Sequence, residues 1–193
     1  MRDSASPELA ARIVDAADDF RRRLERELHD GAQQRLASVV LALGLAGRTL
    51  TGDAAGLVAE ARSELSLAMA ELRDLARDIY PVLLTEAGLG PALASLTDRC
   101  PVPVVVSAVP AGRLADSVER TCYFVVSETL GNMAGATRAE VAVREPGGHV
   151  TVEVLAVGAG RGPDLSALAD RVQAHGGRLH VESDRVMADL PCA

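Results

Sequence analysis

Aromatic residues are scarce in this chain of 193 residues: they make up 2% of it, with two tyrosines, two phenylalanines and no tryptophan. Hydrophobic cores must therefore be built from leucine, valine and alanine, and the scarcity argues against a surface of aromatic rings that stacks single-stranded nucleic acid. Positive charge is also in short supply, because 20 basic residues stand against 27 acidic ones and the net charge is −7. That balance argues against a broad phosphate-binding surface for nucleic acid.

Long hydrophobic runs and paired cysteines are missing as well. The longest apolar stretch, "LASVVLALGLAG" at residues 36–47, is too short to span a bilayer, and the first residues contain no secretory hydrophobic segment. Cys100, Cys122 and Cys192 are an odd number of cysteines without metal-binding spacing. We expect them to be thiols in a reducing cytosol, mainly with structural roles. These features predict a cytoplasmic, globular protein without a membrane segment.

Two long amphipathic helices are predicted in the first part of the chain, residues 7–81. The first covers about residues 7–50 and ends at "TGDAAG", and the second runs from about 57 to 79, where Pro81 stops it. Their apolar stripes contain Leu24, Leu28, Ala32, Leu36, Val39 and Leu43 in the first helix, and Leu65, Met69, Leu72, Ala76 and Ile79 in the second. A short turn makes the pair an antiparallel hairpin with one apolar face uncovered. We expect a second copy to cover that face in a dimeric four-helix bundle; the alternative is that the following domain covers it.

The remainder, residues 83–193, predicts a separate domain that mixes helices and strands. "EAGLGPALASL" is typical of a short helix, "VPVVVSAV" of a strand, and the stretch after residue 115 of a long helix. Two strands joined at Pro146-Gly147-Gly148 form a predicted hairpin, and a further helix and a closing hairpin follow. This order favours an α/β sandwich with helices on one face of a sheet.

The segment "ELHDGAQQRL" places His29 beside Asp30, just outside the apolar stripe of the first helix. A neutral imidazole can attack a phosphorus centre, and a neighbouring carboxylate can orient it and accept its proton. Asp30 and Gln34 are four residues apart and share a helix face, so the Gln34 amide is placed to position a water for the reverse, hydrolytic reaction. Taken alone, the pattern is more often that of a solvated surface histidine.

Several longer segments, taken in order, give the chain a resemblance to sensor histidine kinases, in particular to those that signal to LuxR/NarL-type response regulators. They are "RRRLERELHDGAQQRL", "ELRDLARDIYPVLLTEAGLGPAL", "CYFVVSETLGN" and "ALADRVQAHGGRLHVES". The resemblance covers nearly the whole chain. It implies a dimerisation and phosphoacceptor region followed by a Bergerat-like ATP-binding domain. It also implies that His29 accepts phosphate, with Asp30 as the orienting base and Gln34 positioning water, and that the partner is a receiver domain.

The same resemblance implies a Mg-ATP site, of which only part is retained. Glu128 and Asn132 remain on the long helix, Asn132 as the expected Mg²⁺ ligand. Of the family's Asp-x-Gly-x-Gly pattern, which holds the adenine, Gly158 and Gly160 remain while Ala156 stands in place of the aspartate. A methyl group cannot accept a hydrogen bond from the base.

Other family features around the phosphates are also missing. Gly135 and Ala136 replace a Lys-His pair, Asp164 replaces a glycine of a shortened lid, and "ESDRV" replaces a Gly-Thr segment. The apolar stripes and turns that determine the fold are kept. The sequence therefore assigns no cofactor, and we expect Mg-ATP, the cofactor of the family, to bind weakly or not at all.

The favoured function is phosphotransfer or phosphatase exchange between His29 and a response regulator. One alternative is an active ATP-dependent autokinase. The other is a non-enzymatic pseudokinase that binds a regulator or forms heterodimers with a functional kinase. A homodimer is expected, and no nucleic-acid partner.

Overall fold

The computed structural model describes residues 7–158 and 165–192, which form two compact units. One unit is Ala17–Pro81, and the other joins the residues up to Ala16 with those from Val82 onward. Within the described residues, no helix is long and apolar enough to cross a membrane.

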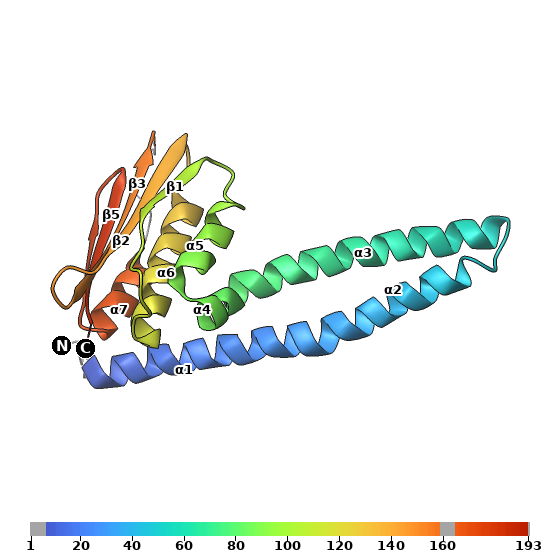
Figure 1. The fold of residues 1–193 in the computed structure, drawn as a ribbon, viewed down its shortest axis with the longest axis horizontal. Coiled ribbons are helices and arrows are strands. Elements are labelled where there is room, and N and C mark those ends of the chain that lie inside the picture. The colour runs from blue at the N-terminus through green and yellow to red at the C-terminus, as the bar shows by residue number, and fades with distance from the viewer. Residues whose placement is uncertain (1–6, 159–164, 193) are drawn as a thin grey trace. The chain divides into compact units, whose positions relative to one another are not determined.

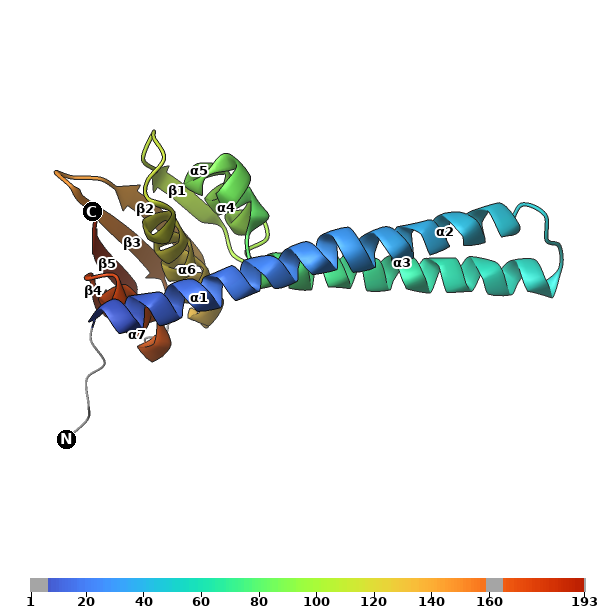
Figure 2. The same cartoon turned by 90° about the horizontal axis from the view of Figure 1, so that it is seen from below.

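Two long antiparallel arms make up the helical unit, and α2 and α3 lie side by side in both ribbon views (Figures 1 and 2). The helical segments are α1 (Pro7–Arg26), η1 (Glu27–Gln33), α2 (Gln34–Ala46) and α3 (Asp53–Ile79); the residues of α1 up to Ala16 belong to the other unit. The prediction of two helices is confirmed, but the second begins at Asp53, before the predicted start near residue 57. Gly52 closes the loop with a positive φ of 67°, and Asp53 then places a carboxylate in the first turn, where the helix dipole favours it.

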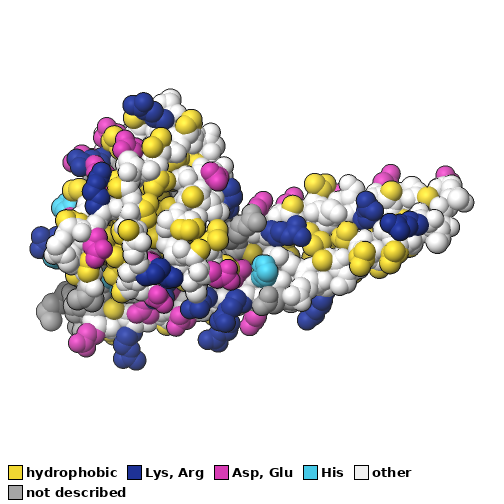
Figure 3. All heavy atoms as spheres, in the orientation of Figure 1, with side chains coloured by type: hydrophobic (Ala, Val, Ile, Leu, Met, Phe, Trp, Pro, Cys, Tyr) yellow, Lys and Arg dark blue, Asp and Glu magenta, His cyan; other side chains and the backbone are white. Residues whose placement is uncertain are grey.

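The predicted apolar stripes face the partner helix to different extents. Met69 and Ala76 of α3 are buried, and Leu36 of α2 is partly buried. Other large apolar side chains of this hairpin, among them Leu57 and Leu75 on α3, are more than 60% exposed in the single chain. Hydrophobic side chains are accordingly visible along the surface of the hairpin in Figure 3.

A five-stranded sheet with strand order β1-β2-β3-β5-β4 forms the centre of the second unit. Its strands are β1 (Val104–Ala108), β2 (Arg138–Arg144), β3 (His149–Val157), β4 (Arg178–Val181) and β5 (Arg185–Pro191). β1 pairs with β2 in parallel, and the other three pairings are antiparallel. The two predicted hairpins, β2–β3 and β4–β5, are confirmed.

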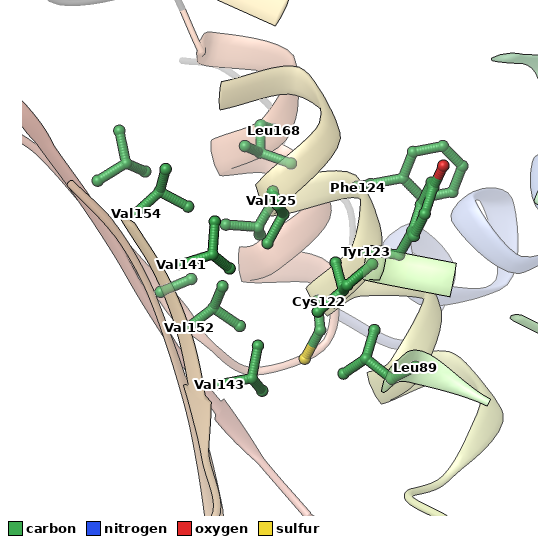
Figure 4. Packing of buried hydrophobic residues seen from close by; sticks show 14 of the residues in the cluster. Leu89, Cys122, Tyr123, Phe124, Val125, Val141, Val143, Val152, Val154 and Leu168 are labelled. Carbon is green, nitrogen blue, oxygen red and sulfur yellow. The ribbon is translucent and has the colours of Figure 1, made fainter. Parts of the chain in front are cut away.

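Helices cover one face of this sheet, as the mixed element order predicts (Figure 1). They are α4 (Val82–Ala87), α5 (Leu89–Thr97), α6 (Asp116–Asn132) and α7 (Ser166–Ala174). Cys122 and Val125 of α6 point toward the valines of β2 and β3, which alternate inward along each strand (Figure 4). Because a strand sends alternate side chains to opposite faces, these inward valines build the core.

The short helix predicted at residues 86–96 corresponds to α5, and a further helix, α4, precedes it and is separated from it at Gly88. Gly88 has a φ of 85°, and a Cβ there would meet the Arg113 side chain at 3.0 Å. Arg113 donates from Nε to both carboxylate oxygens of the buried Glu119, at 3.0 and 3.1 Å, and from Nη2 to the Leu84 carbonyl at 3.4 Å. The hydrogen bonding to Glu119 and the negative charge of that carboxylate raise the pKa of Arg113. A single arginine thus ties the end of α4 to α6.

Candidate functional site

His29 lies in η1, a π-helical segment of seven residues inserted between α1 and α2. Its side chain is exposed, whereas Leu28 beside it is partly buried. π-helical turns are rare and occur frequently at functional sites. The sequence pattern predicted a helix here but not the change of helix type.

The residues that follow His29 lie in different environments. Gln33 is buried, and Gln34, the first residue of α2, is exposed. The structure therefore leaves both His29 and Gln34 accessible on the same helical arm. The backbone of Asp30 belongs to η1, but its side chain lies outside what the structure describes, so its role stays a prediction.

Basic side chains precede His29, and the sequence analysis assigned them no role. Arg23 and Arg26 are both exposed in the last turn of α1, and Arg26 donates from Nε to the Arg22 carbonyl at 3.4 Å. The run "RRRLER" was the signal available in the sequence. A guanidinium within a turn of His29 is suited to an anionic group such as phosphate.

The residues expected to hold Mg-ATP lie in the second unit, around the C-terminal end of α6. Asn132, the last residue of α6, is exposed and donates its amide to the Glu128 carbonyl at 2.8 Å. That bond uses the amide nitrogen and leaves the side-chain oxygen for a metal. Thr129 is fully buried, and its hydroxyl has no hydrogen-bond partner in the described part of the chain. Glu128, one turn before Asn132, is partly buried, so the end of this helix keeps both of the residues that the resemblance implies.

The opposite side of the expected site, at the end of β3, offers much less. Ala156 is 0% exposed and belongs to the same core cluster as Met133 and Leu165. Its backbone N–H already donates to the Asp184 carbonyl at 2.7 Å. The side chain at position 156 therefore meets an apolar core, and neither its methyl group nor its backbone N–H is free for a base.

The glycine-rich continuation of β3 is only partly described. Gly158 adopts a φ of 82° beside Thr137, whose hydroxyl donates to the Val157 carbonyl at 3.1 Å. Gly160 and Asp164 lie outside the described residues. Among the described residues, no group of three or more His, Cys, Asp or Glu side chains is arranged to hold a metal ion. Position 156 thus offers no acceptor for the adenine, while Asn132 keeps a side-chain oxygen suited to a metal ion.

Comparison with known proteins points to one family. Residues 21–84 match the family described as histidine kinase. The chain is 33% identical to the sensor histidine kinase MctS of Rhizobium johnstonii over 171 residues, which cover 83% of this chain and 37% of that protein. It is 28% identical to the signal transduction histidine-protein kinase/phosphatase DegS of Brevibacillus brevis over 160 residues, 77% of this chain and 42% of that protein. The chain thus spans about two-fifths of the length of these relatives.

Proposed function

Since the chain belongs to the histidine kinase family, we propose that it exchanges phosphate between His29 and the receiver domain of a response regulator. The observation that carries the proposal is the exposed imidazole of His29 on a π-helical turn inside the segment that matches the family. An exposed imidazole on a helix can be reached by the phosphorylated aspartate of a separate receiver domain.

In the transfer step, a ring nitrogen of neutral His29 attacks the phosphorus of an aspartyl phosphate on the receiver domain. The N–P bond forms as the P–O bond to the receiver's aspartate breaks, and that carboxylate leaves with the electron pair. The proton on the other ring nitrogen passes to the Asp30 carboxylate. The exposed Arg26 stabilises the negative charge of the incoming phosphate.

The hydrolytic reaction uses Gln34 in place of the imidazole. A water held by the exposed Gln34 amide attacks the same phosphorus, the bond to the aspartate breaks, and inorganic phosphate leaves carrying the proton of the water. The name of DegS includes both kinase and phosphatase. The accessible position of Gln34 at the start of α2 supports the hydrolytic reaction in this chain.

The proposal includes a degraded nucleotide site in the domain of residues 83–193, which we assign as Bergerat-like. The buried, apolar surroundings of Ala156 support the proposal of a degraded nucleotide site, because an adenine amino group there finds no carboxylate. A hydrogen bond to a charged acceptor contributes about 1.5–3 kcal/mol, so its loss alone weakens binding roughly ten- to hundredfold. The second candidate, an ATP-dependent autokinase, is favoured by the retained pair Glu128 and Asn132.

Residues 7–81 are proposed as the dimerisation domain, with a homodimer as the expected state and a heterodimer with a functional kinase as the alternative. Leu57 and Leu75 lie eighteen residues apart on α3, which is five α-helical turns, so they share one side of the helix. Both are highly exposed in the single chain. A stripe of this kind needs cover from another surface, and a second copy buries it in a four-helix bundle.

Two measurements on the purified protein test the proposal. The first adds LuxR-type receiver domains, phosphorylated with acetyl phosphate, and follows acid-labile phosphate on the chain. We expect label on His29, its loss in His29→Gln, and normal transfer with slower receiver dephosphorylation in Gln34→Ala. The absence of label on the wild-type chain with every receiver would refute the transfer reaction.

The second measurement is thermal unfolding with and without Mg-ATP. We expect no stabilisation at nucleotide concentrations that stabilise an intact relative. A saturable shift that disappears in Asn132→Ala would establish the autokinase instead.

A further inference from the structure

The apolar residues that lead into and through η1 recur at a spacing that an α-helix does not accommodate. Leu24, Leu28, Ala32 and Leu36 are each four residues apart. In an α-helix, each step of four overshoots a full turn by about 40°, so three steps amount to about 120°. All four side chains are nevertheless partly buried. The helix must therefore absorb this drift between residues 24 and 36.

The exposure of His29 is a second observation that indicates a change in helical geometry between residues 24 and 36. His29 is seven residues before Leu36, about two α-helical turns, so an unbroken α-helix would put both on one face. Leu36 is partly buried and His29 is exposed. The π-helical hydrogen bonds of η1 span five residues instead of four, and the added residue turns the His29 side chain to a different face of the helix from Leu36.

We infer that η1 holds a one-residue insertion in the helix, and that this insertion positions His29 by turning its imidazole away from the apolar stripe. The inference rests on the proposed function of His29. It adds that the π-helical backbone of residues 27–33 sets the direction in which the His29 side chain leaves the helix. Gly31, in the middle of η1, is the residue whose deletion tests whether η1 positions His29.

Deletion of Gly31 removes the extra residue without removing a side chain. A Cβ built at Gly31 meets nothing within 4 Å, so no packing contact depends on it. After the deletion the apolar residues follow a spacing of four, three and four, which an α-helix accommodates on one face. The stripe is kept, but His29 and Gln34 stand one residue closer along the chain and face different directions.

The test compares this deletion with a deletion of Ala70, an exposed residue in the middle of the α-helical α3. We expect the Gly31 deletion to unfold at the wild-type temperature or above and to keep the wild-type oligomeric state. The Ala70 deletion should lower the unfolding temperature, because it rotates the two halves of α3 by about 100° with no extra residue to absorb the change. Labelling of His29 by receiver domains phosphorylated with acetyl phosphate should fall roughly a hundredfold in the Gly31 deletion.

Three results would overturn the inference. A Gly31 deletion as unstable as the Ala70 deletion would show that η1 holds no extra residue, and one labelled like wild type would show that η1 does not position His29. In the wild-type chain, diethyl pyrocarbonate should modify His29 about as fast as the exposed His149; slow modification of His29 would mean that it faces the stripe. A wild-type chain without phosphate label refutes the proposed function instead, while the stability and modification measurements still decide on the insertion.

Discussion

Replacing Ala156 by aspartate, the residue that the resemblance to histidine kinases implies at this position, tests whether the expected nucleotide site is closed. The side chain at position 156 is fully buried among apolar residues such as Met133 and Leu165. An unpaired carboxylate at such a position destabilises a fold by about 3–5 kcal/mol. At roughly 4 °C per kcal/mol for a domain of this size, the unfolding temperature should fall by about 12–20 °C.

The destabilisation should also depend on pH, with a definite sign. Burial raises the pKa of a carboxyl group, so the folded variant holds its proton above the ordinary value of about 3.9. The variant is then least destabilised near pH 4, and it loses up to about 1.4 kcal/mol for each pH unit above that. The assay is thermal unfolding from pH 4 to pH 8, with and without Mg-ATP. Val157→Asp is the matched control, because residue 157 points to the other face of β3 and is 38% exposed. An Ala156→Asp protein with unchanged stability and a saturable Mg-ATP shift would show that the site is open and that the reasoning is wrong.

Three further predictions concern the fold and the dimer. Arg113→Ala should lower the unfolding temperature more than Glu119→Gln does in thermal scans, because only the arginine change leaves a buried charge without its partner. Equal shifts would show that Arg113 does not stabilise the contact between α4 and α6. Burial raises the pKa of the Cys122 thiol, so the unfolded chain ionises first above about pH 8.5 and stability should fall from there upward. Urea titrations from pH 7.5 to 10 should show a shallower fall in Cys122→Ala, and identical slopes would count against the buried neutral thiol. In light scattering, Leu75→Glu should give monomers. Leu67→Glu should stay dimeric, because Leu67 is about as exposed as Leu75 but lies eight residues earlier, on another side of α3. A dimeric Leu75→Glu protein and a monomeric Leu67→Glu protein would place the interface on that other side.

The sequence by itself determined the identity and order of most elements. Alternation of valine with polar residues predicted β2 and β3, because side chains of a strand alternate between a core and the opposite face. Apolar residues at helical spacing predicted the two long arms. The segment around His29 suggested the phosphoacceptor hypothesis only together with the resemblance of the longer segments, since a histidine beside an acidic residue is by itself a common surface pattern.

Only the tertiary structure decided how those local features are presented. The sequence pattern predicted a helix through His29 but not its change to π-helix, which occurs where η1 packs against α3. The environment of Ala156 was likewise invisible in the sequence, which showed a missing carboxylate but not the apolar core that surrounds the position. Helix α4 was not predicted, and at Gly88, which separates it from α5, the chain lies against Arg113, twenty-five residues further along. Each of these outcomes depends on contacts between residues distant in sequence, which no local pattern encodes.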